Sequence, residues 1–106
     1  MQLRHATKRS NLESIQRDGL LPNKAVGKRA AVWLHKPGKT PWALLHTQTR
    51  KGASLEELVV LEINVPRSWL TRHQTGLWYC PRVLSPDRIT HVTEATAWAV
   101  SPVQDN

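Results

Sequence analysis

This sequence has one cysteine, no phenylalanine and no apolar run long enough to span a membrane. The lone Cys80 excludes an internal disulfide and a multi-cysteine zinc site, and it favours a reducing, cytoplasmic location. Without a membrane-spanning run or a signal-peptide core, we expect no membrane association. The sequence also lacks a Walker loop, a dinucleotide glycine fingerprint and a nucleophile elbow. The five histidines show no tight metal-ligand spacing, so we expect no metal site.

Acidic residues are scarce in the first half of the chain. Residues 1–52 hold eleven Lys and Arg against two acids, a balance of +9, whereas residues 53–106 hold four Arg against six acids, a balance of −2. A basic half indicates an anionic ligand or a nucleic acid, with a generally solvated basic surface as the equal alternative. We expect salt-sensitive contacts with a polyanion. The candidate residues are Lys8, Arg9, Lys24, Lys28, Arg29, Arg50 and Lys51.

The order of the expected elements predicts one α+β domain over residues 1–106. Its sheet should be mostly antiparallel and could be split, and it should carry two helices. The first helix should start at a capping box of Ser10 and Glu13 and stop at Gly19. The second should run from Pro41 to about Arg50, with Thr40 as its N-cap.

Apolar and alternating runs mark the expected strands. The run at 58–65 begins as a continuous apolar stretch, which is typical of a strand buried on both faces. Pro81 indicates an edge or a bulge in the strand that contains it. Residues 23–29 should form a loop and 66–70 a turn or a single helical turn. Strands are expected at 30–35, 58–65, 76–83, 88–92 and 96–100, and the three residues 3–5 are too few to assign.

Two polar residues near the start of the chain are candidates for ligand binding. If His5 and Thr7 lie on a strand, they point to the same face and could bind a ribose edge or a carboxamide. Aromatic rings could stack on a base, and arginines could hold a pyrophosphate. Alternatively, His5 caps a strand end and the tryptophans fill the core. Cys80 is expected to be a buried, inert thiol, although a nucleophilic Cys–His pair stays open.

Several short segments resemble an ADP-ribosyltransferase-like domain. The opening of that domain is a strand with His-x-Thr, a short helix and a Gly-Leu-x-Pro stop. The sequence is most similar to the C-terminal lobe of the tRNA 2′-phosphotransferases and, more loosely, to the DNA-modifying ADP-ribosyltransferase toxins. The segments that carry the resemblance are Leu3-Arg4-His5-Ala6-Thr7, Asn11-Leu12, Ile15, Asp18-Gly19-Leu20-Leu21-Pro22, Ala31–His35, Leu58–Val65 and Gly76–Ile89, in the family's order.

The resemblance implies NAD as the cofactor and names candidate residues. Toxin-type transferases use a late Glu, but no acid lies between Glu62 and Asp87 here. The phosphotransferases instead use an Arg–His pair from an additional lobe, which this sequence does not contain. We therefore expect any transferase activity to be independent of a late Glu, with Arg82 or Arg50 holding phosphate. The implied NAD-binding residues are His5, Thr7, Arg29, Trp33 and His35, and the catalytic candidates are His5 and Arg82.

Three functions remain open from the sequence. The first is an NAD-dependent transferase that acts on a nucleic-acid or protein acceptor. The second is a catalytically silent, basic module that binds nucleic acid. The third is a small phage- or toxin-type interaction protein that binds a partner protein through exposed Trp and Arg. For the first, we expect His5 and Thr7 to face a pocket that Trp33 or His35 also reaches.

Overall fold

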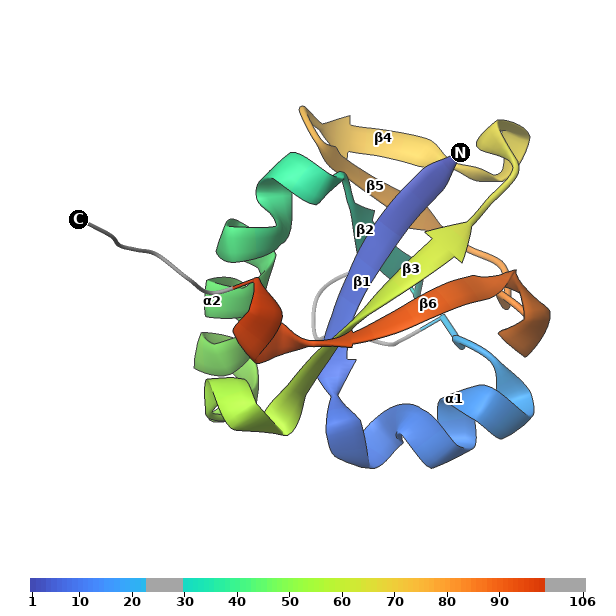
Figure 1. Cartoon of the computed structure of the whole chain (residues 1–106). Helices are drawn as coiled ribbons and strands as arrows, with labels where there is room; N and C mark the ends of the chain where they lie inside the picture. The colour runs from blue at the N-terminus through green and yellow to red at the C-terminus, as the bar shows by residue number, and fades with distance from the viewer. Residues whose placement is uncertain (23–29, 99–106) are drawn as a thin grey trace.

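The computed structural model describes residues 1–22 and 30–98, and within them six strands form one antiparallel sheet (Figure 1). The strand order across the sheet is β4-β5-β2-β1-β3-β6. An α+β fold with two helices and an antiparallel sheet is therefore confirmed. The helices are α1 (Leu12–Asp18) and α2 (Thr40–Lys51). The strands are β1 (Gln2–Lys8), β2 (Val32–His35), β3 (Leu58–Asn64), β4 (Thr71–Gln74), β5 (Leu77–Cys80) and β6 (Ile89–Glu94).

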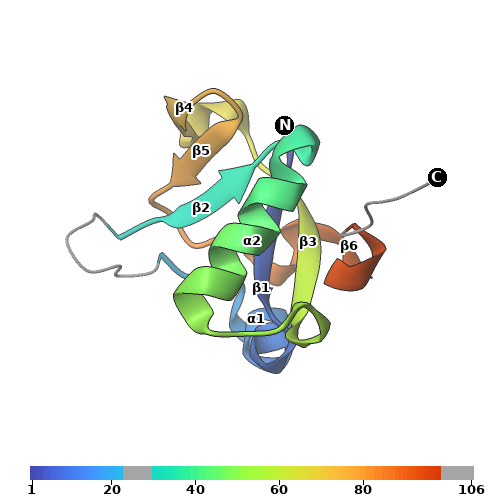
Figure 2. The same cartoon turned by 90° about the vertical axis from the view of Figure 1, so that its left-hand side faces the viewer.

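Strand β3 is buried on both faces, as its continuous apolar run predicts. Val59, Leu61 and Ile63 pack into a core on the α1 side of the sheet. Leu58 and Val60 pack on the opposite side with Leu44 and Ala53 from α2 and the loop that follows it. Figure 2 shows α2 lying across β1 and β3. The two helices therefore cover opposite faces of the sheet, and β3 contributes to both cores.

The expected capping box of α1 is wrong, whereas its expected end is correct. The N-cap is Asn11, and no side chain caps the helix. Ser10 lies instead in a 3₁₀ turn that precedes the helix. Gly19 ends α1 with φ +86°, and its amide donates to the Ile15 carbonyl at 2.7 Å. A capping box is formed instead by Ser54 and Glu57, ahead of β3.

Other differences from the expected strands have local causes. Residues 71–74, which have no apolar run, form the exposed edge strand β4. Pro81 follows the end of β5, which lies inside the sheet between β4 and β2. The strand expected at 96–100 is wrong in its described part, because Ala95–Ala97 forms a 3₁₀ turn. The turn expected at 66–70 is a 3₁₀ turn at Arg67–Trp69. The loop expected at 23–29 lies outside the described residues.

Strand β1 pairs with β2 over far fewer residues than it pairs with β3. Strand β1 pairs with β3 through seven residue pairs, from Gln2 with Asn64 to Lys8 with Leu58. Its registered pairing with β2 in the described chain is a single pair, Arg4 with His35. The sheet is thus continuous, but its two halves join at one narrow point and separate beyond it. The candidate site lies at this separation.

Candidate functional site

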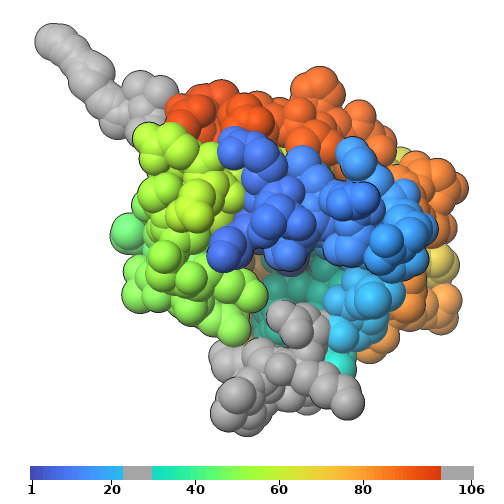
Figure 3. Space-filling view, turned by 90° about the horizontal axis from the view of Figure 1, so that it is seen from below, coloured from blue at the N-terminus to red at the C-terminus, as the bar shows by residue number. Residues whose placement is uncertain are grey.

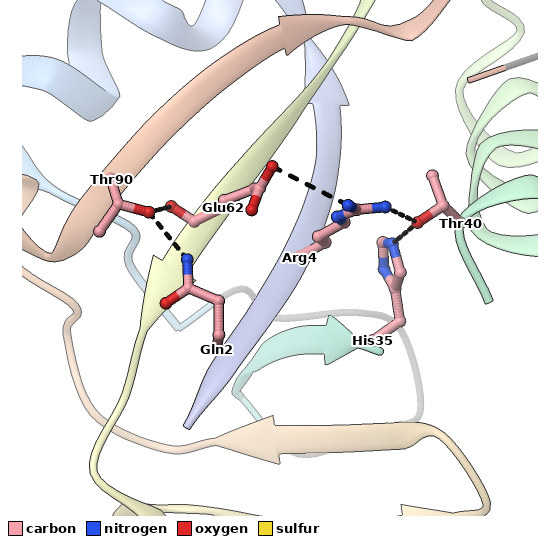
Figure 4. Close-up of polar contacts among 6 residues, drawn as sticks. All are labelled: Gln2, Arg4, His35, Thr40, Glu62 and Thr90. Atoms are coloured by element: carbon pink, nitrogen blue, oxygen red, sulfur yellow. Dashed lines mark hydrogen bonds and ion pairs between the residues drawn. The ribbon is translucent and has the colours of Figure 1, made fainter. Parts of the chain in front are cut away.

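A buried polar cluster holds β1, β2 and α2 together at the point where the strands join (Figure 4). Arg4 Nη1 donates to Thr40 Oγ1 at 3.1 Å, and Thr40 Oγ1 lies 3.3 Å from His35 Nε2. Arg4 also lies 3.9 Å from Glu62 and stacks over the Trp98 ring at 3.8 Å. Arginine stays protonated, so the Thr40 oxygen accepts from Arg4 and its hydroxyl is free to donate to His35. The cluster fixes where β1 and β2 part.

Thr40 does not have the helix-capping role expected from the sequence. Helix α2 begins at Thr40 itself, its N-cap position is Lys39, and no side chain caps it. The Thr40 hydroxyl is buried and bonds across to β1 and β2 instead. A buried hydroxyl that lacked such partners would be costly, so these bonds tie the start of α2 to the sheet.

His5 bridges the two strands just beyond this cluster. Its Nδ1 lies 2.7 Å from the Trp33 carbonyl oxygen, two residues along β2 from the last registered pair. Because a carbonyl can only accept, Nδ1 carries the proton. Burial lowers the pKa of His5; the hydrogen bond to Trp33 opposes this shift, and the charge of Lys51 adds to it. In the neutral ring, Nε2 is therefore an acceptor.

Beyond His5 the strands enclose a cleft of about 760 Å³. Figure 3 shows this hollow between the blue N-terminal segment and the green end of α2. Its wall includes residues of β1, α1, β2, α2 and β4. The structure thus brings four of the five residues implied to bind NAD to one cleft, namely His5, Thr7, Trp33 and His35.

Thr7 is held in place by the turn that precedes α1. Asn11 Nδ2 donates to Thr7 Oγ1 at 3.1 Å, and both residues line the cleft. The threonine oxygen accepts this bond, so its hydroxyl proton is available for another partner. His5 and Thr7 thus offer an acceptor and a donor from alternate positions of β1, which point to the same face of the strand.

Aromatic rings that the sequence did not single out also line the cleft. Trp42 and His46 on α2 stack with centroids 4.9 Å apart and planes 10° apart. Trp33 meets His73 of β4 edge-on at 5.1 Å. Trp42 and His46 are four residues apart, which places them on one face of the expected helix, and this spacing could have identified the pair from the sequence. The sequence does not predict that His73 lies beside β2, because the strand that carries it, β4, has no apolar pattern by which it could be identified.

The charged residues at the cleft are few. Arg50 and Lys51, from the last turn of α2, line it, and Asp18 is the acid that does so among the described residues. The cleft therefore has more positive than negative charge, which suits an anionic ligand. His35 stays neutral at physiological pH, because burial, the nearby His5 and Arg4 lower its pKa to about 4.

Of the remaining candidates, the three that the structure describes, namely Lys8, Arg9 and Arg82, are not among the residues that line the cleft. Arg9 pairs with Glu94, and Lys8 lies at the end of β1 against β3. The guanidinium of Arg82 lies 4.7 Å from the centroid of Trp69, and Arg82 is not among the described cleft-lining residues. Three of the cations predicted to bind a polyanion lie outside the described residues, namely Lys24, Lys28 and Arg29.

Cys80 and the arrangement of possible metal ligands complete the description of the reactive side chains. Cys80 is buried and free, with its Sγ 3.8 Å from the Arg82 carbonyl oxygen. No group of three or more His, Cys, Asp or Glu within residues 1–22 and 30–98 is arranged to hold a metal ion. No helix in those ranges is long and apolar enough to cross a membrane.

Comparison of the sequence with models of known protein families gives no match, and neither does comparison with curated protein sequences. The resemblance to ADP-ribosyltransferase-like domains therefore stays a prediction, and the case for a function depends on the cleft.

Proposed function

We propose that this protein binds NAD in the cleft between β1, β2 and α2 and acts as an ADP-ribosyltransferase-like enzyme. The observation that carries the proposal is the position of His5, whose side chain occupies the point where the sheet opens. Its partner residues Thr7, Trp33 and His35 line the same cleft. The sequence resemblance assigns these four residues to NAD, and their assembly at one cleft supports that assignment.

The chemistry of the cleft fits a dinucleotide. Its volume of about 760 Å³ lies within the range of roughly 300–1,000 Å³ that small-molecule sites occupy. Neutral His5 Nε2 can accept from a ribose hydroxyl, and the Thr7 hydroxyl can donate to a ribose oxygen or to a carboxamide. Trp33, with Trp42 and His46 on α2, offers faces for a planar ring. Arg50 and Lys51 can neutralise a pyrophosphate.

Bound NAD would supply the glycosidic bond to nicotinamide that ADP-ribosyl transfer breaks. The residues of this chain would position the ribose from β1 and hold the phosphates from the last turn of α2. Arg50 takes the phosphate-binding role in this proposal, because Arg82 lies against Trp69, apart from the cleft. The acceptor is proposed to be a nucleic acid or a protein, and the location is proposed to be cytoplasmic, as the single cysteine suggests.

Calorimetric titration of NAD into the wild type and into His5→Ala tests the binding site. We expect the wild type to bind and His5→Ala to bind at least about tenfold more weakly, because the variant loses both the ribose acceptor and the bridge to Trp33. His91→Ala is the matched control, since His91 is an exposed histidine on β6 that does not line the cleft in the described chain. Its affinity should equal that of the wild type.

Two results would contradict the proposal. One is a wild type that does not bind NAD, and the other is equal affinity in the wild type and His5→Ala. Nicotinamide release, measured in the same samples, separates two of the functions left open by the sequence. Binding without release would favour the catalytically silent module.

A further inference from the structure

A second positively charged site lies outside the cleft, and it comes from the half of the sequence that is acidic overall. The Trp69 ring has two guanidinium groups over it. The Arg82 group lies 4.7 Å and the Arg88 group 4.4 Å from the ring centroid. Arg67, two residues before Trp69 in the same 3₁₀ turn, lies 5.7 Å over Trp78. We call these three arginines the Trp69 cluster.

The tryptophans that hold the Trp69 cluster are anchored in the core. Trp78 is buried in the core on the α1 side of the sheet, and Trp69 packs against that core while keeping part of its surface accessible. A guanidinium over an indole face gains a cation–π attraction and has its orientation restricted. Arg82 and Arg88 are therefore oriented by one ring that packs against the core, and Arg67 lies over a second, buried ring at a longer distance.

No carboxylate of the described chain forms an ion pair with the arginines of the Trp69 cluster. Within the described residues none of the three arginines forms an ion pair, whereas Arg4, Arg9 and Arg17 each do. Arg88 donates to the Asn64 carbonyl oxygen at 3.3 Å, and no side-chain hydrogen bond is found for Arg67 or Arg82 in that part of the chain. The neighbouring carboxylate, Asp87, accepts from Ser85. Its pKa is lowered first by that hydrogen bond and only to a smaller extent by Arg88.

We infer that the Trp69 cluster binds the phosphate backbone of a nucleic acid. A guanidinium has five donors in a planar fork that matches phosphate oxygens, and among the described residues the one side-chain donor of the cluster with a hydrogen-bond partner is on Arg88. The guanidiniums of Arg82 and Arg88 lie 4.7 and 4.4 Å from the same ring centroid, so they are at most 9.1 Å apart (4.7 + 4.4), and a ligand with repeated negative charges could meet both. Contacts to phosphate position a strand without reading its bases, so binding through these arginines should be independent of sequence.

The inference does not depend on NAD binding. None of the three arginines is among the described residues that line the cleft. A protein that never bound NAD could still use the Trp69 cluster, and loss of the cluster should leave the cleft intact. The two proposals can therefore fail separately.

The test is the binding of a fluorescent single-stranded oligonucleotide, followed by anisotropy between about 50 and 300 mM salt. Each phosphate neutralised on a single strand contributes a slope of about −0.7 to a plot of log affinity against log salt. The variant Arg67→Gln/Arg82→Gln/Arg88→Gln should therefore have a slope shallower by about 2 than the wild type. Its affinity at the lowest salt should fall by at least about tenfold.

A matched control changes the net charge equally elsewhere. Arg17→Gln/Lys36→Gln/Lys39→Gln removes three exposed cations outside the cluster and the cleft. We expect it to retain most of the wild-type slope. Because the arginine stems also cover Trp69, the variant Arg67→Lys/Arg82→Lys/Arg88→Lys provides a charge-preserving check. It should recover the slope while binding more weakly than the wild type, since lysine lacks the planar fork.

Three outcomes would overturn the inference. The first is equal slopes in the wild type and the glutamine variant, and the second is an equal loss of slope in the charge-matched control. The third comes from competition with poly-glutamate. If poly-glutamate displaced the oligonucleotide as well as unlabelled oligonucleotide does at equal charge, the cluster would be a site for acidic protein.

Discussion

His35 lines the candidate site and also affects the stability of the fold. It is 4 % exposed, it accepts a hydrogen bond from Thr40, and it shares that hydroxyl with Arg4. Burial, the proximity of His5 and the charge of Arg4 together lower its pKa from 6.5 to about 4. The unfolded chain therefore binds a proton at this position at a pH where the folded chain does not.

This difference predicts a loss of stability in mild acid. Because the folded pKa is depressed, the contribution of neutral His35 is fully present above the unfolded value of 6.5 and is lost as the pH falls from 6.5 towards 4. The free energy of unfolding should be lower at about pH 5 than at about pH 7 by about 2 kcal/mol. His5, whose pKa is also lowered, adds to the effect in the same direction. Urea denaturation at the two pH values measures it.

His35→Gln provides the comparison, because glutamine does not titrate in this range. The His35→Gln variant should have a lower free energy of unfolding at neutral pH, and that free energy should change less with pH. The control His91→Gln, at an exposed position, should keep the pH dependence of the wild type. If the free energy of unfolding of His35→Gln fell between pH 7 and pH 5 as much as that of the wild type, the fold would not lower the pKa of His35.

At the scale of elements, the end of α1 shows how a backbone position constrains the sequence. Gly19 has φ +86°, and a Cβ built there would collide with the carbonyl of Leu84. Leu20 then pairs with Leu84 through two backbone hydrogen bonds of 2.8 and 2.9 Å. The helix therefore stops where the chain must pass close to the segment that follows β5.

Gly19→Ala should destabilise the protein by about 2 kcal/mol or more, because it combines an unfavourable φ with a backbone clash. Gly38→Ala is the control, since a Cβ added at Gly38 would meet no atom within 4 Å and its φ lies outside the left-handed range. Its effect should stay within about 0.5 kcal/mol. Thermal unfolding followed by circular dichroism compares the two. Similar midpoints for both variants would mean that the chain relaxes around Gly19 without strain.

At the scale of the whole molecule, the glutamates of the described chain lie away from the cleft. Glu62 lies beside Arg4 in the polar cluster, and Glu94 pairs with Arg9. Among the described residues no glutamate lines the cleft, and Asp18 is the one aspartate that does. A glutamate-dependent mechanism would need a carboxylate close to the ribose, and the fold does not bring one there from the described chain.

If the protein releases nicotinamide from NAD, Glu62→Gln and Glu94→Gln should therefore each retain most of that activity. We expect a change of less than about tenfold, because neither side chain lines the cleft. Nicotinamide release by folded variants measures this, and Arg50→Gln, which removes a cation of the cleft, should be the more damaging change. Abolished release in either glutamate variant would place a catalytic acid where we have assigned a structural one.

Local pattern was enough to determine much of the fold. The apolar run of β3, the stop at Gly19, and the start of α2 near Pro41 follow from short-range chemistry, namely apolar burial, backbone freedom and a fixed φ. His5 and Thr7 could be selected because their spacing on a strand is also local. The edge strand β4 could not be predicted, because its four residues are exposed and lack a burial pattern.

Only the tertiary structure decided how the site is assembled. The cleft exists because β1 and β2 join at one pair, and a cluster from three separate elements holds them there. Thr40 could be interpreted as a helix cap until its hydroxyl was seen to bond to Arg4 and His35. The four arginines of the second half looked like a minority in an acidic segment, yet three of them surround two tryptophans. Sequence patterns report which face of an element is buried, whereas contacts between distant elements depend on how those faces pack.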